Sequence, residues 1–199
     1  MGKQFPSIEP SHREFMLKQR IFFNASAARD GRVNLSPRDV ASFRVLGPGT
    51  VVYLDRTGSG NETAAHVRAH GHLTLMFCAF EGPPLILRLY GRGRVIRRHT
   101  PEYEAILASE FASIEPAGAR QMIMLHVDRV QTSCGYGVPL FECVSERDTL
   151  DRWAQAKGEA GLEEYRRLKN ARSIDGLDPG LLEEAEIIAL CISPPHSSA

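Results

Sequence analysis

Residues 72–96 read HLTLMFCAFEGPPLILRLYGRGRVI, and this stretch decides the fold. His72 to Phe80 is an apolar run of strand length, and Leu85 to Ile96 is a second, longer one. The four residues between them, Glu81-Gly82-Pro83-Pro84, can form only a turn, so the two strands must be antiparallel. Glycines at positions 91 and 93 predict a bulge or bend in the second strand.

Further strands are predicted on both sides of this pair. They are Ile21 to Ala27, Val33 to Ser36 (ended by Pro37), Thr50 to Asp55 and Gln121 to Val130. The Asp30-Gly31 pair predicts a tight turn between the first two, and residues 38–49 are interpreted as a loop. Six strands with short connections predict a mainly β protein with flanking helices (α+β), built on a small six-stranded antiparallel closed or split barrel.

Helices are expected around this barrel. The first begins at Ser11, whose spacing to Glu14 is that of a capping box. Asn61 to His70 is a second helix with Asn61 as N-cap, and Thr100-Pro101 begins a third. Charged amphipathic helices are predicted over Ser145 to Lys157 and Glu159 to Lys169. Apolar spacing predicts that Leu150, Trp153, Leu162 and Tyr165 pack these helices onto the barrel.

The 199 residues fit a single domain, 1–199, since domains usually span about 100–200 residues. We divide it into a split barrel with flanking helices (10–145), a C-terminal helical extension (146–190) and a disordered tail (193–199). Hydrophobic residues make up 43%, and the formal net charge is zero, which argues against a nucleic-acid-binding protein. No apolar run reaches membrane-span length, and the four cysteines form no CxxC pair. A soluble cytoplasmic protein with reduced thiols is expected, without membrane contact.

A strand, a Gly/Ser turn and a helix follow one another in residues 54–63, LDRTGSGNET. Free backbone N–H groups at the beginning of a helix suit a phosphate group. The stretch is neither a P-loop nor a GxGxxG fingerprint, so an ordinary connecting turn is the alternative.

Three other features have a functional and a structural interpretation. The segment from Gln131 to Pro139, QTSCGYGVP, contains small residues, so its backbone could approach a flat ligand or another subunit closely. Cys134 in this segment could be a nucleophile if His126, in the preceding strand, lies beside it as a base. His66 and His70 share a helix face, but the HExxH pattern of a zinc site is absent, so no metal is predicted. Arg88, Arg92 and Arg94 share a strand face, where they could hold an anion or face solvent.

Taken together, several stretches resemble the pyridoxamine 5'-phosphate oxidase-related family. They are DGRVNLSP (30–37), VVYLD (51–55), GSGNET (58–63), LMFCAFEGPP with ILRLYGRGRV (75–95) and QTSCGYGVP (131–139). The resemblance covers about residues 10–170. It implies an FMN-binding split barrel, a homodimer, and FMN held at the dimer interface.

The resemblance also implies site residues. Asn34, Leu35 and Ser36 on one strand, with Tyr53, Leu54 and Asp55 on the next, would flank the isoalloxazine ring. Ser59, Asn61, Glu62 and Thr63 would meet the ribityl phosphate, and Gln131, Ser133 and Cys134 would come from the partner subunit. Because Glu62 is acidic, an arginine should complete the phosphate site, and Arg38 and Arg88 are the candidates.

The chain departs from the founding enzyme, which has two basic residues where Glu62-Thr63 stand here. The resemblance therefore points to a subgroup of the family. We expect an FMN-dependent oxidoreductase that acts on a small-molecule substrate. The alternatives are a flavin carrier or sensor without turnover, and a haem- or deazaflavin-binding relative on the same barrel.

Overall fold

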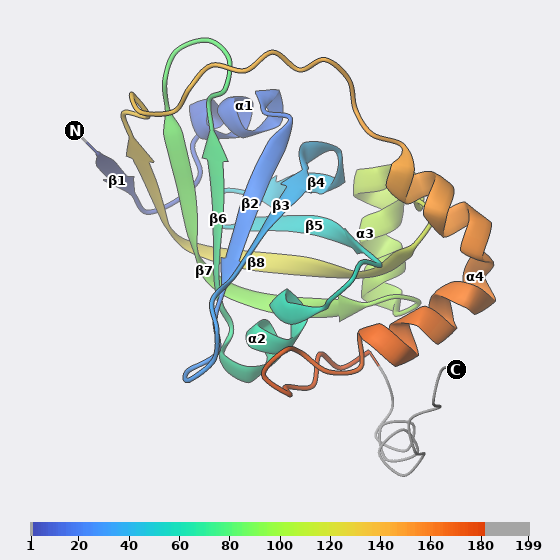
Figure 1. Cartoon of the computed structure of the whole chain (residues 1–199). Coiled ribbons are helices and arrows are strands. Elements are labelled where there is room, and N and C mark those ends of the chain that lie inside the picture. The colour runs from blue at the N-terminus through green and yellow to red at the C-terminus, as the bar shows by residue number, and fades with distance from the viewer. Residues whose placement is uncertain (1, 182–199) are drawn as a thin grey trace.

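The computed structural model describes residues 2–181, which form an antiparallel sheet curled into half of a barrel (Figure 1). The strands are β1 (Lys3–Phe5), β2 (Ile21–Ser26), β3 (Asn34–Asp39), β4 (Phe43–Gly47), β5 (Thr50–Arg56), β6 (His72–Cys78), β7 (Ile86–Arg97) and β8 (Ala119–Ser133). The helices are α1 (Pro10–Lys18), α2 (Glu62–His70), α3 (Pro101–Phe111) and α4 (Thr149–Lys169), with a short 3-10 helix η1 (Val40–Ser42). The strand order is β3-β2-β6-β7-β8-β5-β4, and β1 pairs with β8. The predicted antiparallel split barrel is confirmed.

The described residues contain eight strands, whereas the sequence predicted six. β1 is only three residues long, and its residues Lys-Gln-Phe carry no apolar alternation. β4 lies in the stretch interpreted as a loop, and it becomes a strand by pairing with β5 at an edge of the sheet. Both are short, so their strand conformation depends on the neighbour that they pair with.

Two predicted boundaries were wrong for local reasons. Pro37 lies inside β3 instead of ending it, because β3 is an edge strand that pairs with β2 alone within residues 2–181, and an edge tolerates a missing N–H donor. Helix α1 has Glu9, not Ser11, as its N-cap. The backbone N–H of Glu9 donates to Nδ1 of His12 at 3.1 Å, and Pro10 occupies the first turn.

Each face of the curled sheet carries its own apolar core. Inside the half-barrel, alternate residues of the central strands pack with Phe22, Phe43, Tyr53 and Phe77. On the other face, α3 covers β5, β7 and β8 through Tyr103, Leu107 and Phe111. Because side chains alternate between the two faces of a strand, neighbouring residues of β5 belong to different cores.

The long strands β7 and β8 bend at Gly91, where the pairing register shifts between Tyr90 and Gly91. A Cβ atom at position 91 would overlap the carbonyl oxygen of His126, so the close approach of the two backbones requires glycine. At Gly93 a Cβ would come within 2.9 Å of the Val67 side chain on α2. The irregularity expected in β7 is confirmed at Gly91, whereas Gly93 pairs with Leu125 in unbroken register.

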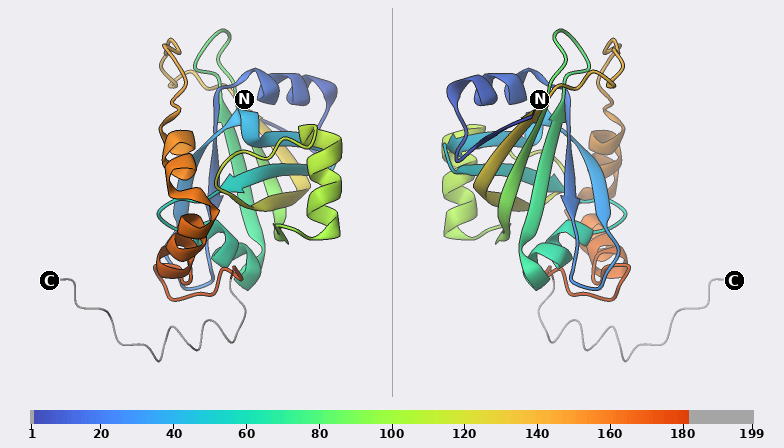
Figure 2. Two further views of the ribbon diagram at one scale, coloured as in Figure 1. Left: turned by 90° about the vertical axis from the view of Figure 1, so that its right-hand side faces the viewer. Right: turned by 90° about the vertical axis from the view of Figure 1, so that its left-hand side faces the viewer.

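The C-terminal extension runs down the side of the sheet opposite α3 (Figure 2). Helix α4 begins at Thr149, later than predicted, and it is broken at Gly158 (φ 64°), between the two predicted helices. Leu162 is buried, whereas Leu150 is 39% exposed and Trp153 stacks edge-on against Tyr165 of the same helix. Leu150 therefore does not pack the extension onto the barrel as predicted. The predicted tail (193–199) and residues 182–190 of the extension lie outside the described residues.

Polar contacts of Arg166 attach α4 to the barrel beside the buried Leu162. Its guanidinium donates to Thr57 Oγ1 at 2.8 Å and to the carbonyl of Ala119 at 3.1 Å, and it forms an ion pair with Glu159. Within residues 2–181, none of the helices has both the length and the apolar character needed to cross a membrane.

Candidate functional site

A chain of buried and half-buried polar side chains connects β2, β3 and β5 to helix α2. Asn24 on β2 donates to Oγ1 of Thr63 on α2 at 2.6 Å, and Asn34 on β3 donates to the same hydroxyl at 3.0 Å. Ser36 donates to Asn34 Oδ1 at 3.1 Å, and Arg38 Nε donates to Asn24 Oδ1 at 3.2 Å. We call this group, together with Asp55 and its partners, the polar cluster.

Asp55 on β5 is the charged centre of the polar cluster, and its side chain is only 2% exposed. One carboxylate oxygen is 2.7 Å from Arg120 Nε, and the other is 3.0 Å from Arg38. Burial alone would raise the pKa of Asp55, but the charges of Arg120 and Arg38 and the hydrogen bonds hold it below its ordinary value. Two arginine side chains therefore meet at the single carboxylate of Asp55.

The beginning of α2 lies at the same place. Gln121 Nε2 donates to Asp55 and to Oδ1 of Asn61, each at 2.8 Å. Asn61 is the N-cap of α2, and its Nδ2 is buried without a hydrogen-bond partner in the described part of the chain. A buried donor without an acceptor is unfavourable, so this amide is available to an incoming ligand atom.

The structure brings together most of the predicted residues of β3, β5 and the following turn. Asn34, Ser36, Arg38, Tyr53, Asp55, Asn61 and Thr63 lie in or beside the polar cluster. Leu35 and Leu54 point elsewhere because of strand alternation: Leu35 is 62% exposed, and Leu54 packs in the core under α3. Ser59 is exposed, and the carboxylate of Glu62 accepts the backbone N–H of Ile174.

The remaining predicted residues form a second group at the ends of β7 and β8. Arg88 donates to Ser133 Oγ at 3.2 Å, and Gln131 accepts from Tyr90 at 3.0 Å. Cys134 is exposed immediately after β8. Arg120 and Gln121 of the polar cluster stand at the beginning of β8, whereas Gln131 and Ser133 stand at its end, so the two groups lie at opposite ends of this 15-residue strand.

Sequence reasoning missed Asn24, Arg120 and Gln121, which are all at most 4% exposed. Asn24 stands at an inward position of β2, between the buried residues Phe22 and Ser26. This position in the sequence pattern could have identified it as a buried polar residue. A polar residue on the apolar face of a strand needs a buried partner. Arg120 and Gln121 precede the apolar part of β8 and carried no comparable pattern.

The histidine and arginine patterns have structural roles. His66 is buried with Nδ1 at 3.1 Å from Ser26 Oγ, and residues 2–181 hold no group of three or more His, Cys, Asp or Glu able to bind a metal. Arg92 donates to the carbonyl of His70, and Arg94 pairs with Glu102. These two arginines are therefore bound to neighbouring groups on the outer surface.

The fold and the polar cluster define an antiparallel split barrel with a buried polar site between β3, β5 and α2. The family model described as pyridoxamine 5'-phosphate oxidase matches residues 8–134. The pyridoxamine 5'-phosphate oxidase family protein ustO of Aspergillus flavus is 39% identical over 193 residues, covering 89% of this chain and 77% of the relative. The chain belongs to the pyridoxamine 5'-phosphate oxidase family.

Solved structures show the same fold at low sequence identity. A single-residue variant of HupZ from Group A Streptococcus superposes with a TM-score of 0.52 and 20% identity, covering 63% of this chain and 99% of that one. A second HupZ structure gives a TM-score of 0.50 at 20% identity, covering 62% and 91%. At 20% identity the structural similarity shows that the barrel fold is shared, and it gives no information about a ligand.

Proposed function

We propose that this protein binds FMN at the polar cluster and acts as an FMN-dependent oxidoreductase on a small molecule. The observation that carries the proposal is the polar cluster, in which Arg38 and Arg120 meet at Asp55, on the strands and turn that the family match covers. A flavin ring has polar edges, and its phosphate is dianionic, so hydrogen-bonding side chains and a net positive charge suit it. A cytoplasmic location remains a prediction from the composition.

The residues present fit such a ligand. Asn34 and Ser36 offer amide and hydroxyl groups to the ring, and Arg38 places a positive charge beside them. Asn61 offers its unpartnered amide, and the N-terminus of α2 offers a partial positive charge to the phosphate. When bound, FMN supplies the chemistry of accepting a hydride or electrons, while the chain holds it in position and sets the electrostatics around it.

Arg38 gives the first prediction. Arg38→Ala is expected to weaken FMN binding about tenfold or more, because a hydrogen bond from a charged donor contributes about 1.5–3 kcal/mol. The measurement is a titration of FMN fluorescence, with Ser59→Ala and Arg88→Ala in the same series. Asp55 keeps its ion pair with Arg120 in the variant, so the fold should persist, and circular dichroism checks this.

Arg94→Ala is the matched control for that series, since Arg94 pairs with Glu102 on the outer surface. Unchanged FMN affinity in both Arg38→Ala and Arg88→Ala would place the phosphate site elsewhere. The absorption spectrum of the purified protein tests the proposal itself: flavin peaks support it, and a Soret band indicates haem instead. Reduction of bound flavin by NAD(P)H then separates an enzyme from a carrier.

A homodimer is part of the same proposal. The residues at the ends of β7 and β8 are separate from the polar cluster within one chain, and a second chain could supply them. Supporting this, the extended segment after β8 carries Leu140, Phe141 and Val144, each at least 60% exposed (Figure 1). Exposed apolar residues in succession are typical of an interface. Sedimentation at micromolar concentration is expected to show a dimer, and a monomer would contradict the proposal.

A further inference from the structure

The chain that follows α4 turns back along the end of the molecule where α2 and the β2–β3 turn lie (Figure 1). We call residues 170–180 the clasp. Its first residue, Asn170, is fully buried: Oδ1 accepts from Arg120 at 2.8 Å, and Nδ2 donates to the carbonyl of Gly58 at 3.0 Å. The base of the clasp is therefore fixed to the polar cluster and to the Gly/Ser turn.

The middle of the clasp holds a carboxylate against an arginine. Asp175 accepts the backbone N–H of Arg32 at 2.7 Å and also pairs with the Arg32 guanidinium. The hydrogen bond from the Arg32 backbone contributes most to lowering the pKa of Asp175, so the carboxylate is ionised near neutral pH. A Cβ at position 31 would lie 2.8 Å from Asp175 Oδ2, so Gly31 makes room for the carboxylate. This turn is an anion site that the chain itself fills.

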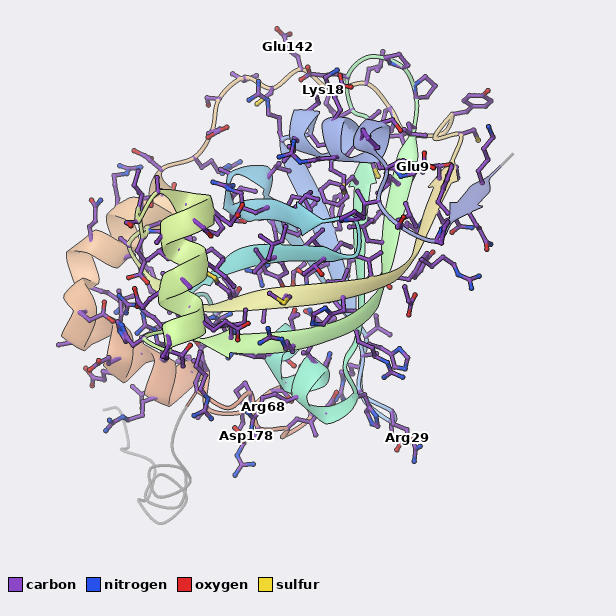
Figure 3. The ribbon with its side chains drawn as sticks, turned by 180° about the vertical axis from the view of Figure 1, so that it is seen from behind. Glu9, Lys18, Arg29, Arg68, Glu142 and Asp178 are labelled. Atoms are coloured by element: carbon purple, nitrogen blue, oxygen red, sulfur yellow. The ribbon has the colours of Figure 1, made fainter. Side chains whose placement is uncertain are left out.

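Two further contacts hold the clasp to α2. The backbone N–H of Ile174 donates to both carboxylate oxygens of Glu62, at 3.0 and 3.1 Å. Arg68 pairs with Asp178 at 3.3 Å, and Figure 3 shows these two side chains together below α2. Ile174 itself is 69% exposed, so polar contacts rather than apolar burial hold this part of the clasp. Exposed ion pairs are weak, which makes the middle of the clasp displaceable.

The groups next to the clasp are not fully satisfied. Asn61 Nδ2 and His66 Nε2 are buried and have no hydrogen-bond partner among residues 2–181. Asn61 directly precedes Glu62, to which the clasp is bonded, and His66 lies one turn further along α2. Buried polar groups at this end of α2 therefore remain without hydrogen-bond partners in the part of the chain that the structure describes.

We propose that the clasp is a lid that a phosphate-bearing ligand opens, with Asp175 occupying the anion site of Arg32 until the phosphate replaces it. A phosphate carries more charge and more acceptor oxygens than a carboxylate, so it competes for Arg32 and can also accept from Asn61. Its charge repels Glu62, which breaks the hydrogen bonds that the Ile174 N–H donates to Glu62 and releases the middle of the clasp. The inference rests on the proposed function, because FMN is the phosphate-bearing ligand considered.

Trypsin provides the test, because Arg172 is an exposed cleavage site within the clasp. FMN and inorganic phosphate are each expected to accelerate cleavage after Arg172, measured by mass spectrometry of the fragment that ends there. Asp175→Asn is expected to bind FMN about two- to fivefold more tightly and to be cleaved faster without ligand, since an exposed ion pair contributes up to about 1 kcal/mol. Glu102→Gln is the matched control, because it weakens an exposed ion pair with Arg94 that lies outside the clasp, and it should leave FMN affinity unchanged.

The outcomes separate the lid from the proposed function. If FMN binds the wild type and Asp175→Asn equally, and cleavage at Arg172 does not respond, the lid is refuted while FMN binding stands. If FMN binds neither, but inorganic phosphate accelerates cleavage of the wild type and has less effect on Asp175→Asn, the lid stands and the proposed function fails. If FMN does not bind and neither anion changes cleavage, both are refuted. Unfolding midpoints of the variants establish that each is folded.

Discussion

Asp55→Ala is expected to lower the free energy of unfolding by about 3–5 kcal/mol, because it removes the carboxylate that pairs with the buried Arg120 and the half-buried Arg38. The Arg120 side chain is 2% exposed, and in the variant its remaining side-chain partner is Asn170. An unpaired buried charge is the costly result of breaking such a pair. Urea denaturation followed by circular dichroism measures the change, and FMN binding should be lost in the same variant.

Asp151→Ala is the matched control for Asp55→Ala. Asp151 also pairs with an arginine, Arg56, but it is 42% exposed, so the expected loss is about 0–1 kcal/mol. Equal losses in the two variants would show that the buried network contributes little.

The Asp55 ion pairs also make the stability of the protein depend on pH. Because the pKa of Asp55 is lower in the folded state, its contribution to the free energy of unfolding is complete above the unfolded pKa of about 3.9 and is lost as the pH falls below that value. The stability of the wild type should therefore decline more steeply in acid than that of Asp55→Asn.

Phe22→Ala is expected to lower the free energy of unfolding by about 3–5 kcal/mol, since it opens a cavity in the core of the half-barrel. Phe22 is fully buried, and its ring centroid lies 5.4 Å from those of Tyr53 and Phe77 and 5.5 Å from that of Phe43. These rings come from four strands, so their packing joins both ends of the sheet. The midpoint of thermal or urea unfolding measures the loss.

Phe141→Ala is the comparison for Phe22→Ala, because Phe141 is 60% exposed and packs only against Phe80 among the aromatic rings of the described residues. Removing it should cost the folded monomer less than about 1.5 kcal/mol, the contribution of one aromatic pair. A loss at Phe22 no larger than that at Phe141 would contradict the view that the aromatic cluster stabilises the barrel.

The candidate site was predicted from the sequence only in part. The stretches of β3, β5 and the Gly/Ser turn identified Asn34, Arg38, Asp55, Asn61 and Thr63, which the structure brings together. The partners that satisfy them were not predicted. Arg120 is 65 residues from Asp55, and Asn170 is 50 residues further, so only the pairing of β5 with β8 and the return of the chain after α4 bring them into contact.

The sequence by itself determined the antiparallel barrel, because apolar alternation and turn residues act over a few positions and are visible in the chain. The turn at Gly82-Pro83 and the bulge at Gly91 therefore lie where they were predicted. The tight turn predicted at Asp30-Gly31 is wrong, because residues 27–33 form a longer loop between β2 and β3 and Gly31 is not among the glycines with positive φ. Tertiary structure alone decided β1 and β4, the interior position of Pro37 and the placement of the clasp. Each depends on a partner far away in sequence: an edge strand exists only where a neighbour offers hydrogen bonds, and the clasp is held by Arg32, 143 residues before Asp175.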